Sequence, residues 1–221
     1  IEAAFNNLYQ LLKYTFQVVQ IRANVDREVV ADVFVRINSE GVKLTAPDFI
    51  LTWLSVFWEE GRSQLEDFAR ASRFTAAELS WEAGHAVSWS PHNPYLVLEP
   101  GQILRVSIAV GMRRAQLQDA YNVLRGRDPR TRQIVPQLRT HELERLKAGQ
   151  ERALRANNWD EFLRVLARAG IRNASMITSK NTVLYGYALW LIGRTEFGVP
   201  VDELRELMAR IRSVLRRSGL A

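Results

Sequence analysis

Apolar residues recur at helical spacing through most of the 221 residues, and this periodicity restricts the possible folds more than any other feature. The segment "NTVLYGYALWLIGRTEFG", residues 181–198, is apolar on nearly every side and predicts a buried helix. Only "FQVVQIRA", residues 16–23, alternates with β-branched residues in the way typical of a strand. We therefore expect a mainly α fold, a multi-helix domain with at most one or two short strands near the N-terminus.

Capping residues and glycines mark where helices begin and end in the N-terminal part of the chain. Thr45 as N-cap, Pro47 in the first turn and Asp48 at the third position predict a helix start. Gly61 is expected to end this helix, because glycine favours helix termination. The other helices expected in this part cover residues 2–15, 24–38 and 62–74.

The middle of the chain loses this periodicity. Residues 75–101 combine prolines, tryptophans and histidines, and predict an ordered loop with one short helix. Beyond the loop we expect one long helix over 103–126, two helices over 138–170 hinged near Asn157 and Asn158, the buried helix over 181–198, and an amphipathic helix over 200–219. The expected organisation is one continuous domain made of a helical segment 1–74, an irregular segment 75–101 and a helical segment 102–221.

The composition argues against several classes of protein. The chain has no cysteine, which excludes disulfides, thiolate metal sites and cysteine nucleophiles and fits a cytoplasmic location. No apolar run reaches the roughly 18 residues that a membrane-spanning helix needs, so no membrane partner is expected.

Common catalytic and metal-binding motifs are absent from the sequence. It has no Walker-type phosphate loop, no G-x-G-x-x-G fingerprint and no H-E-x-x-H pair. His85 and His92 lie seven positions apart without a committed third ligand, so we predict no metal site and no cofactor in this chain. Trp53, Phe57 and Trp58 stand at helical spacing beside other apolar residues, which favours a place in the core over stacking on bases.

Net positive charge is concentrated in one segment. The whole chain carries +6, and residues 101–139 hold eight arginines against two aspartates, so the remainder is balanced. Four of these arginines, Arg125, Arg127, Arg130 and Arg132, stand in one short turn-rich stretch.

Clustered arginines are what phosphate binding requires, and this stretch is the best pointer to function that the residues themselves offer. Two plain alternatives stay open: a solvated loop, or arginines paired with acidic neighbours; GC-rich coding also favours arginine. The candidate nucleic-acid-binding residues are Arg113, Arg114, Arg125, Arg127, Arg130 and Arg132.

The stretch "FVRINSEGVKLTAPDF", residues 34–49, carries a resemblance to a known family. It resembles the F-x-R-x-N-[ST]-x-G-x-x-L-[ST]-x-x-[DE] signature of the domain of unknown function 262, the N-terminal module of GmrSD-type, modification-dependent restriction proteins. The matching residues are Phe34, Arg36, Asn38, Ser39, Gly41, Leu44, Thr45 and Asp48. Weaker resemblance continues through the later helical segments.

This resemblance implies a prokaryotic anti-phage role with nucleotide hydrolysis or DNA sensing, and a nucleotide and a divalent metal in the full-length protein. The family's catalytic D-G-Q-Q-R element and a nuclease-type His-x-x-Pro element do not occur in this sequence, which begins at Ile1. We therefore expect a fragment that is not active alone, with the missing catalytic half or a nuclease as partner and a homo-oligomer left open.

The turn at the end of the 24–38 helix allows two interpretations. By resemblance, Phe34, Arg36, Asn38, Ser39 and Gly41 lie next to a nucleotide or ligand. Alternatively, the turn is only a well-capped corner between two helices.

Two hypotheses for function follow. Either the chain contributes to DNA or nucleotide binding, or it is a scaffold that docks a catalytic domain or partner subunit and has no ligand of its own.

Overall fold

The computed structural model describes residues 45–177 and 179–200, together with isolated positions between 6 and 33. This part of the chain contains eight α-helices, one 3-10 helix and no strand, so the expected mainly α fold is confirmed. The α-helices are α3 (Ala46–Phe57), α4 (Glu59–Ala71), α5 (Ala76–Ala83), α6 (Pro100–Met112), α7 (Leu117–Leu124), α8 (Pro136–Leu154), α9 (Ala156–Arg168) and α10 (Lys180–Glu196), and the 3-10 helix is η1 (Ala174–Met176). The strand predicted over residues 16–23 falls largely outside the described residues, as do the helices predicted over 2–15, 24–38 and 200–219.

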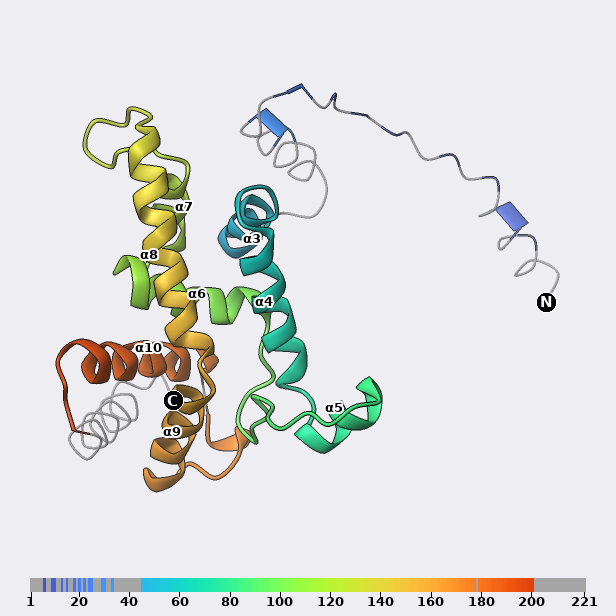
Figure 1. Ribbon diagram of the computed structural model, residues 1–221, viewed down its shortest axis with the longest axis vertical. Coiled ribbons are helices and arrows are strands. Elements are labelled where there is room, and N and C mark those ends of the chain that lie inside the picture. Colours follow the sequence, from blue (N-terminus) through green and yellow to red (C-terminus); the bar gives the residue numbers. More distant parts are fainter. Residues whose placement is uncertain are drawn as a thin grey trace.

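Helix α6 is the centre of the fold. Its buried side chains point to all sides, and the helix contacts α3, α4, α7, α8 and α10 (Figure 1). A helix that is apolar all round has to be covered by other helices on every face. The 19-residue α8 makes the most extensive of these contacts.

The crossing of α6 and α8 is close enough to bring the two backbones together. A Cβ atom on Gly149 would lie 2.3 Å from the carbonyl oxygen of Ser107, and one on Gly111 would overlap the carbonyl oxygen of Arg145. Only glycine fits at these two positions without a shift of the helices. We call the contact of Ser107 and Gly111 with Arg145 and Gly149 the glycine crossing.

An aromatic cluster fills the core between α4, α9 and α10. The rings of Phe162 and Tyr187 lie 4.8 Å apart, and Trp159 meets Tyr187 edge-on at 5.1 Å. Trp159, Phe162 and Tyr187 are at most 1% exposed, as is Trp190. Trp53 is likewise buried, and Phe57 and Trp58 pack against the core, so the predicted core role of these three aromatic residues is confirmed.

Helix α3 begins as its sequence predicts but ends earlier. Thr45 and Asp48 form the capping box: the Asp48 carboxylate accepts from the Thr45 backbone N–H at 2.8 Å. The prediction that Gly61 closes this helix is wrong, because the chain breaks at Trp58 and Gly61 lies inside α4. The physical reason is packing: the Trp58 ring covers Gly61 and leaves no room there for a Cβ atom.

The single long helix expected over 103–126 is also wrong, because the chain breaks into α6 and α7 at Arg113. Arg113 takes the left-handed conformation, with φ 57°, although no glycine or proline marks the site. Its guanidinium donates to the carbonyl oxygen of Val110 and pairs with Glu196, and so occupies the free end of α6. The break lets α7 bury one face against α3 and α8.

Two further expectations, the hinge near Asn157 and the irregular segment 75–101, are close to the structure. The hinge between α8 and α9 lies at Arg155, two residues before the predicted Asn157. In the irregular segment, α5 is followed by an extended loop that the Asn93 carboxamide oxygen organises by accepting from the N–H groups of Tyr95 and Leu96. None of the helices described between residues 46 and 196 is long and apolar enough to cross a membrane.

Candidate nucleic-acid interface

The arginine-rich stretch forms one ordered loop at the N-terminal end of α8. We call residues 125–135, between α7 and α8, the arginine loop. An isolated antiparallel bridge joins Arg127 to Ile134, and the Val135 N–H donates to the Gly126 carbonyl at 2.7 Å. Gly126 has φ +78°, and a Cβ there would lie 2.9 Å from the Val135 carbonyl oxygen. Glycine is therefore required where the loop leaves α7.

Asp128 organises the tip of the arginine loop. Its Oδ1 accepts hydrogen bonds from the backbone N–H groups of Arg130 at 2.7 Å and Thr131 at 2.8 Å. These bonds, first that of Thr131 and then that of Arg130, lower the pKa of Asp128 below its ordinary value. The Arg132 N–H donates back to the Asp128 carbonyl at 2.8 Å, and Arg132 itself has φ 59°. The backbone is thus fixed by its own hydrogen bonds, while the arginine side chains are not needed to hold it.

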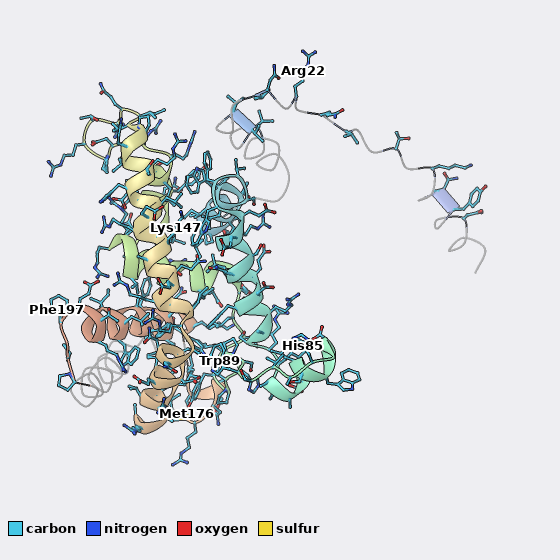
Figure 2. All side chains as sticks on the ribbon, viewed as in Figure 1. Arg22, His85, Trp89, Lys147, Met176 and Phe197 are labelled. Carbon is cyan, nitrogen blue, oxygen red and sulfur yellow. The ribbon has the colours of Figure 1, made fainter. Side chains whose placement is uncertain are left out.

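Three arginines of this loop face solvent. Arg127, Arg130 and Arg132 are exposed, and within residues 45–177 and 179–200 none of them forms an ion pair with a carboxylate. Figure 2 shows nitrogen-tipped side chains spreading outward around the loop at this end of α8. Unpaired guanidinium groups on an ordered loop are available to anionic ligands.

A hollow opens beside the loop. It has a volume of about 370 Å³, is more polar than apolar, and is lined by arginines from two parts of the chain. We call it the arginine hollow; its lining residues are Arg114, Asp119, Asn122, Arg127, Asp128, Pro129 and Arg132. The buried Nε of Arg114 has no hydrogen-bond partner in the described structure.

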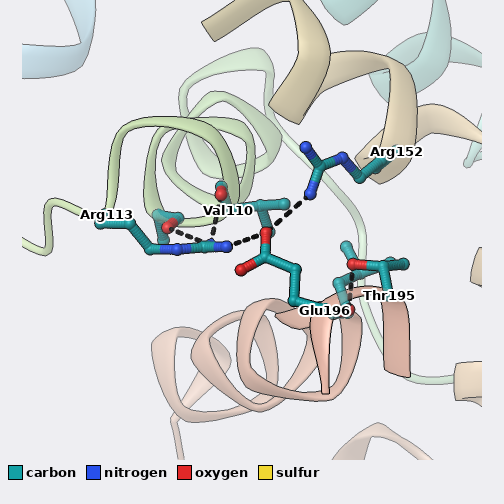
Figure 3. Close-up of polar contacts among 7 residues, drawn as sticks. Val110, Arg113, Arg152, Thr195 and Glu196 are labelled. Atoms are coloured by element: carbon teal, nitrogen blue, oxygen red, sulfur yellow. Dashed lines mark hydrogen bonds and ion pairs between the residues drawn. The ribbon is translucent and has the colours of Figure 1, made fainter. Parts of the chain in front are cut away.

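The other candidate arginines have different surroundings. The guanidinium of Arg125 lies over the Tyr121 ring, 5.6 Å from its centroid. Arg113 turns away from the loop toward α10 (Figure 3). The structure therefore brings Arg114, Arg127 and Arg132 together, with Arg130 beside them on the loop, and separates Arg113 from the group.

Arg113 belongs to an ion cluster that fastens the end of α10. The Glu196 carboxylate accepts from Arg113 and, at 2.9 Å, from Arg152 of α8 (Figure 3). Burial alone would raise the pKa of Glu196, but the hydrogen bonds from the two arginines outweigh it and lower that pKa. The cluster joins α6, α8 and α10, which is a structural role.

The residues of the family-like motif cannot be placed beside this site. Phe34, Arg36, Asn38, Ser39 and Gly41 lie outside the described residues, and only Thr45 and Asp48 of the motif are described, as the cap of α3. His85 and His92 are exposed on the loop after α5. Among the described residues, no group of three or more His, Asp or Glu side chains is arranged to hold a metal ion.

Sequence reasoning found the loop arginines but missed Asp119 and Asn122. Both lie on the exposed side of α7 and enter the site only because α7 ends beside the loop. Their spacing, three apart on one helix, was the available signal, since such positions share a face.

A scan against protein-family models, a search of curated proteins and a search of solved structures each find no match to this chain. The function is therefore inferred from the residues of the chain and their geometry.

Proposed function

We propose that this chain binds the phosphate backbone of DNA through the arginine loop, as the helical part of a prokaryotic restriction-type defence protein. The observation that carries the DNA-binding part is the group of exposed arginines Arg127, Arg130 and Arg132, which have no carboxylate partner among the described residues and stand on a loop held by its own backbone. The link to defence proteins comes from the resemblance over residues 34–49.

Two properties support this function: the positive charge of residues 101–139 and the ordered backbone of the arginine loop. Residues 101–139 carry the chain's whole net charge of +6, and four of their eight arginines stand in the arginine loop, so an anionic partner is drawn toward the loop. Because Asp128 and the bridge between Arg127 and Ile134 fix the loop before binding, little backbone entropy is lost on contact. Phosphate contacts of this kind give affinity without sequence selection.

The proposal is tested by the affinity of a short DNA duplex for the wild type and for the triple variant Arg127→Ala, Arg130→Ala, Arg132→Ala. We expect the loop variant to bind at least about tenfold more weakly at moderate salt, because three phosphate contacts are lost. The matched control replaces three exposed arginines elsewhere, Arg73, Arg168 and Arg172, by alanine and removes the same charge. Equal weakening in both triple variants would show that only net charge matters.

A second candidate function is the scaffold hypothesis, and α5 provides its observation. Trp81 is 89% exposed and lines an apolar hollow of about 680 Å³ with Phe74 and Ala77. An exposed tryptophan of this kind is common at protein interfaces. If the loop variant keeps full DNA affinity and Trp81→Ser abolishes binding of the proposed nuclease partner, the scaffold function is favoured.

A further inference from the structure

The arginine hollow has features that a flat phosphate-binding surface does not need. Its guanidinium groups come from two separate segments: Arg114 from the link between α6 and α7, and Arg127 and Arg132 from the arginine loop. The Asn122 carboxamide, from α7, adds a side chain that can both donate and accept hydrogen bonds. Polar groups that several segments bring to one small hollow are typical of a ligand site.

Arg114 lies outside the arginine loop, so DNA binding by the loop alone does not explain why this residue lines the hollow. Its Nε is buried and has no hydrogen-bond partner in the part of the chain that the structure describes. Burying a charged donor without an acceptor is costly. The Nε itself is closed to solvent, so an anion in the hollow would neutralise the Arg114 charge through the terminal N–H groups of its guanidinium and not through the Nε.

We infer that the arginine hollow binds a phosphomonoester, held by Arg114, Arg127 and Arg132. A phosphomonoester carries a charge between about −1.5 and −2 at pH 7 and offers three acceptor oxygens, whereas a phosphodiester carries one charge and two free oxygens. Three guanidinium groups on one space match the monoester, because each can form charge-assisted bonds to a different oxygen.

The two carboxylates in the lining reduce its formal charge from +3 to +1, and each also has another role. Asp128 directs one oxygen at the backbone N–H groups of its own loop. Asp119 lies in the first turn of α7, where a negative charge favours the helix N-terminus, and it supplies an acceptor for a sugar hydroxyl.

The size of the hollow indicates the kind of ligand. Its volume of about 370 Å³ is near the lower end of the range of ligand pockets, so it admits a phosphate with its sugar but not a duplex. The phosphomonoester therefore belongs either to the 5′ end of a DNA strand or to a free mononucleotide. If the ligand is the 5′ end of a DNA strand, the inference rests on the proposed function. If the ligand is a free mononucleotide, it does not.

The test compares two duplexes of one sequence, one with a 5′-phosphate and one with a 5′-hydroxyl, and adds titrations with deoxyadenosine monophosphate and inorganic phosphate. We expect the wild type to bind the 5′-phosphate duplex about tenfold more tightly than the 5′-hydroxyl duplex. Arg114→Gln should remove this advantage and leave the 5′-hydroxyl duplex unaffected. Arg130→Ala, outside the hollow, should weaken both duplexes equally.

A second variant keeps the test decisive if Arg114→Gln does not fold. Asn122→Asp adds a negative charge inside the hollow from the partly exposed face of α7, and should also remove the 5′-phosphate advantage.

The outcomes separate the inference from the proposed function. Equal affinity for both duplexes, with no binding of either small phosphate, overturns the inference, while loop-dependent duplex binding would still support the proposed function. Binding of the mononucleotide without binding of either duplex supports the hollow as a nucleotide site and contradicts the proposed function. Loss of the 5′-phosphate advantage in Arg130→Ala alone would overturn the assignment to Arg114.

Discussion

The second half of α8 and the loop that precedes its first residue are held in place in different ways. In its second half the helix meets α6 at the glycine crossing, where Gly149 lies against the Ser107 backbone and nothing larger than hydrogen fits. At its first residue, Pro136, the same helix receives the arginine loop, whose exposed residues Arg127, Arg130 and Arg132 form no ion pair within the described ranges.

This comparison assigns the stability of the fold to the glycine crossing and the binding of a ligand to the arginine loop. The glycine crossing holds α8 by close packing, which tolerates almost no change. The loop holds its own backbone with local hydrogen bonds, which leaves its arginines free to change without unfolding the helices. Substitutions in the two regions should therefore affect different measurements.

The largest effect is expected from Gly149→Ala. The new Cβ would lie 2.3 Å from the Ser107 carbonyl oxygen and 2.6 Å from the Gly111 nitrogen, so α6 and α8 must move apart. We expect a loss of about 3 kcal/mol of unfolding free energy, measured by urea denaturation.

Gly198→Ala is the control for this substitution. It meets no atom within 4 Å and carries only the strain of φ +60°, so it should cost about 1 kcal/mol. Equal losses in the two variants would contradict the close packing of the glycine crossing.

A smaller effect on stability, combined with an effect on binding, is expected from Gly126→Ala. The left-handed φ of +78° and the nearby Val135 carbonyl should cost about 1–2 kcal/mol and distort the start of the arginine loop. Because the loop arginines then lose their preset positions, duplex affinity should fall as well. A stability loss with unchanged affinity would show that loop geometry is irrelevant to binding.

The smallest effect is expected from Glu196→Gln, which weakens the ion cluster at the end of α10. Partly exposed pairs of this kind contribute about 0.5–1 kcal/mol. The folded-state pKa of Glu196 is lowered from its ordinary 4.5, so its contribution is complete above that pH and is lost as pH falls through the lower folded value.

The pH dependence of unfolding free energy checks this prediction. The difference between wild type and Glu196→Gln should be constant near neutral pH and disappear in acid. A difference that grows as pH falls would contradict the sign of the shift.

Local patterns in the sequence predicted the elements that local physics determines. The apolar run of α10 and the capping box of Thr45 and Asp48 lie where they were expected, since burial and capping are encoded in neighbouring residues. The break at Arg113 could not be predicted, because Glu196, with which the Arg113 guanidinium pairs, lies far along the chain. The sequence pattern predicts a helix end at Gly61, but glycine stands there because the Trp58 ring leaves no room for a Cβ atom.

The candidate site also has one part that the sequence predicts and another part that depends on the fold. The loop arginines were evident from clustering, which needs no structure. The arginine hollow depends on Arg114 and Asn122 meeting the loop in space, and on the helix break that precedes α7. The proposed role of Arg36 and Asn38 stays a prediction, as both lie outside the described residues.

The central claim, that the arginine loop contacts phosphates while α8 holds the fold, is tested most directly by the salt dependence of duplex binding. For the triple variant Arg127→Ala, Arg130→Ala, Arg132→Ala, the slope of log K against log salt concentration should become shallower by about 3, close to one for each lost phosphate contact. The melting temperature should match that of the wild type. An unchanged slope, or an equal change in the Arg73, Arg168 and Arg172 control, would contradict the claim.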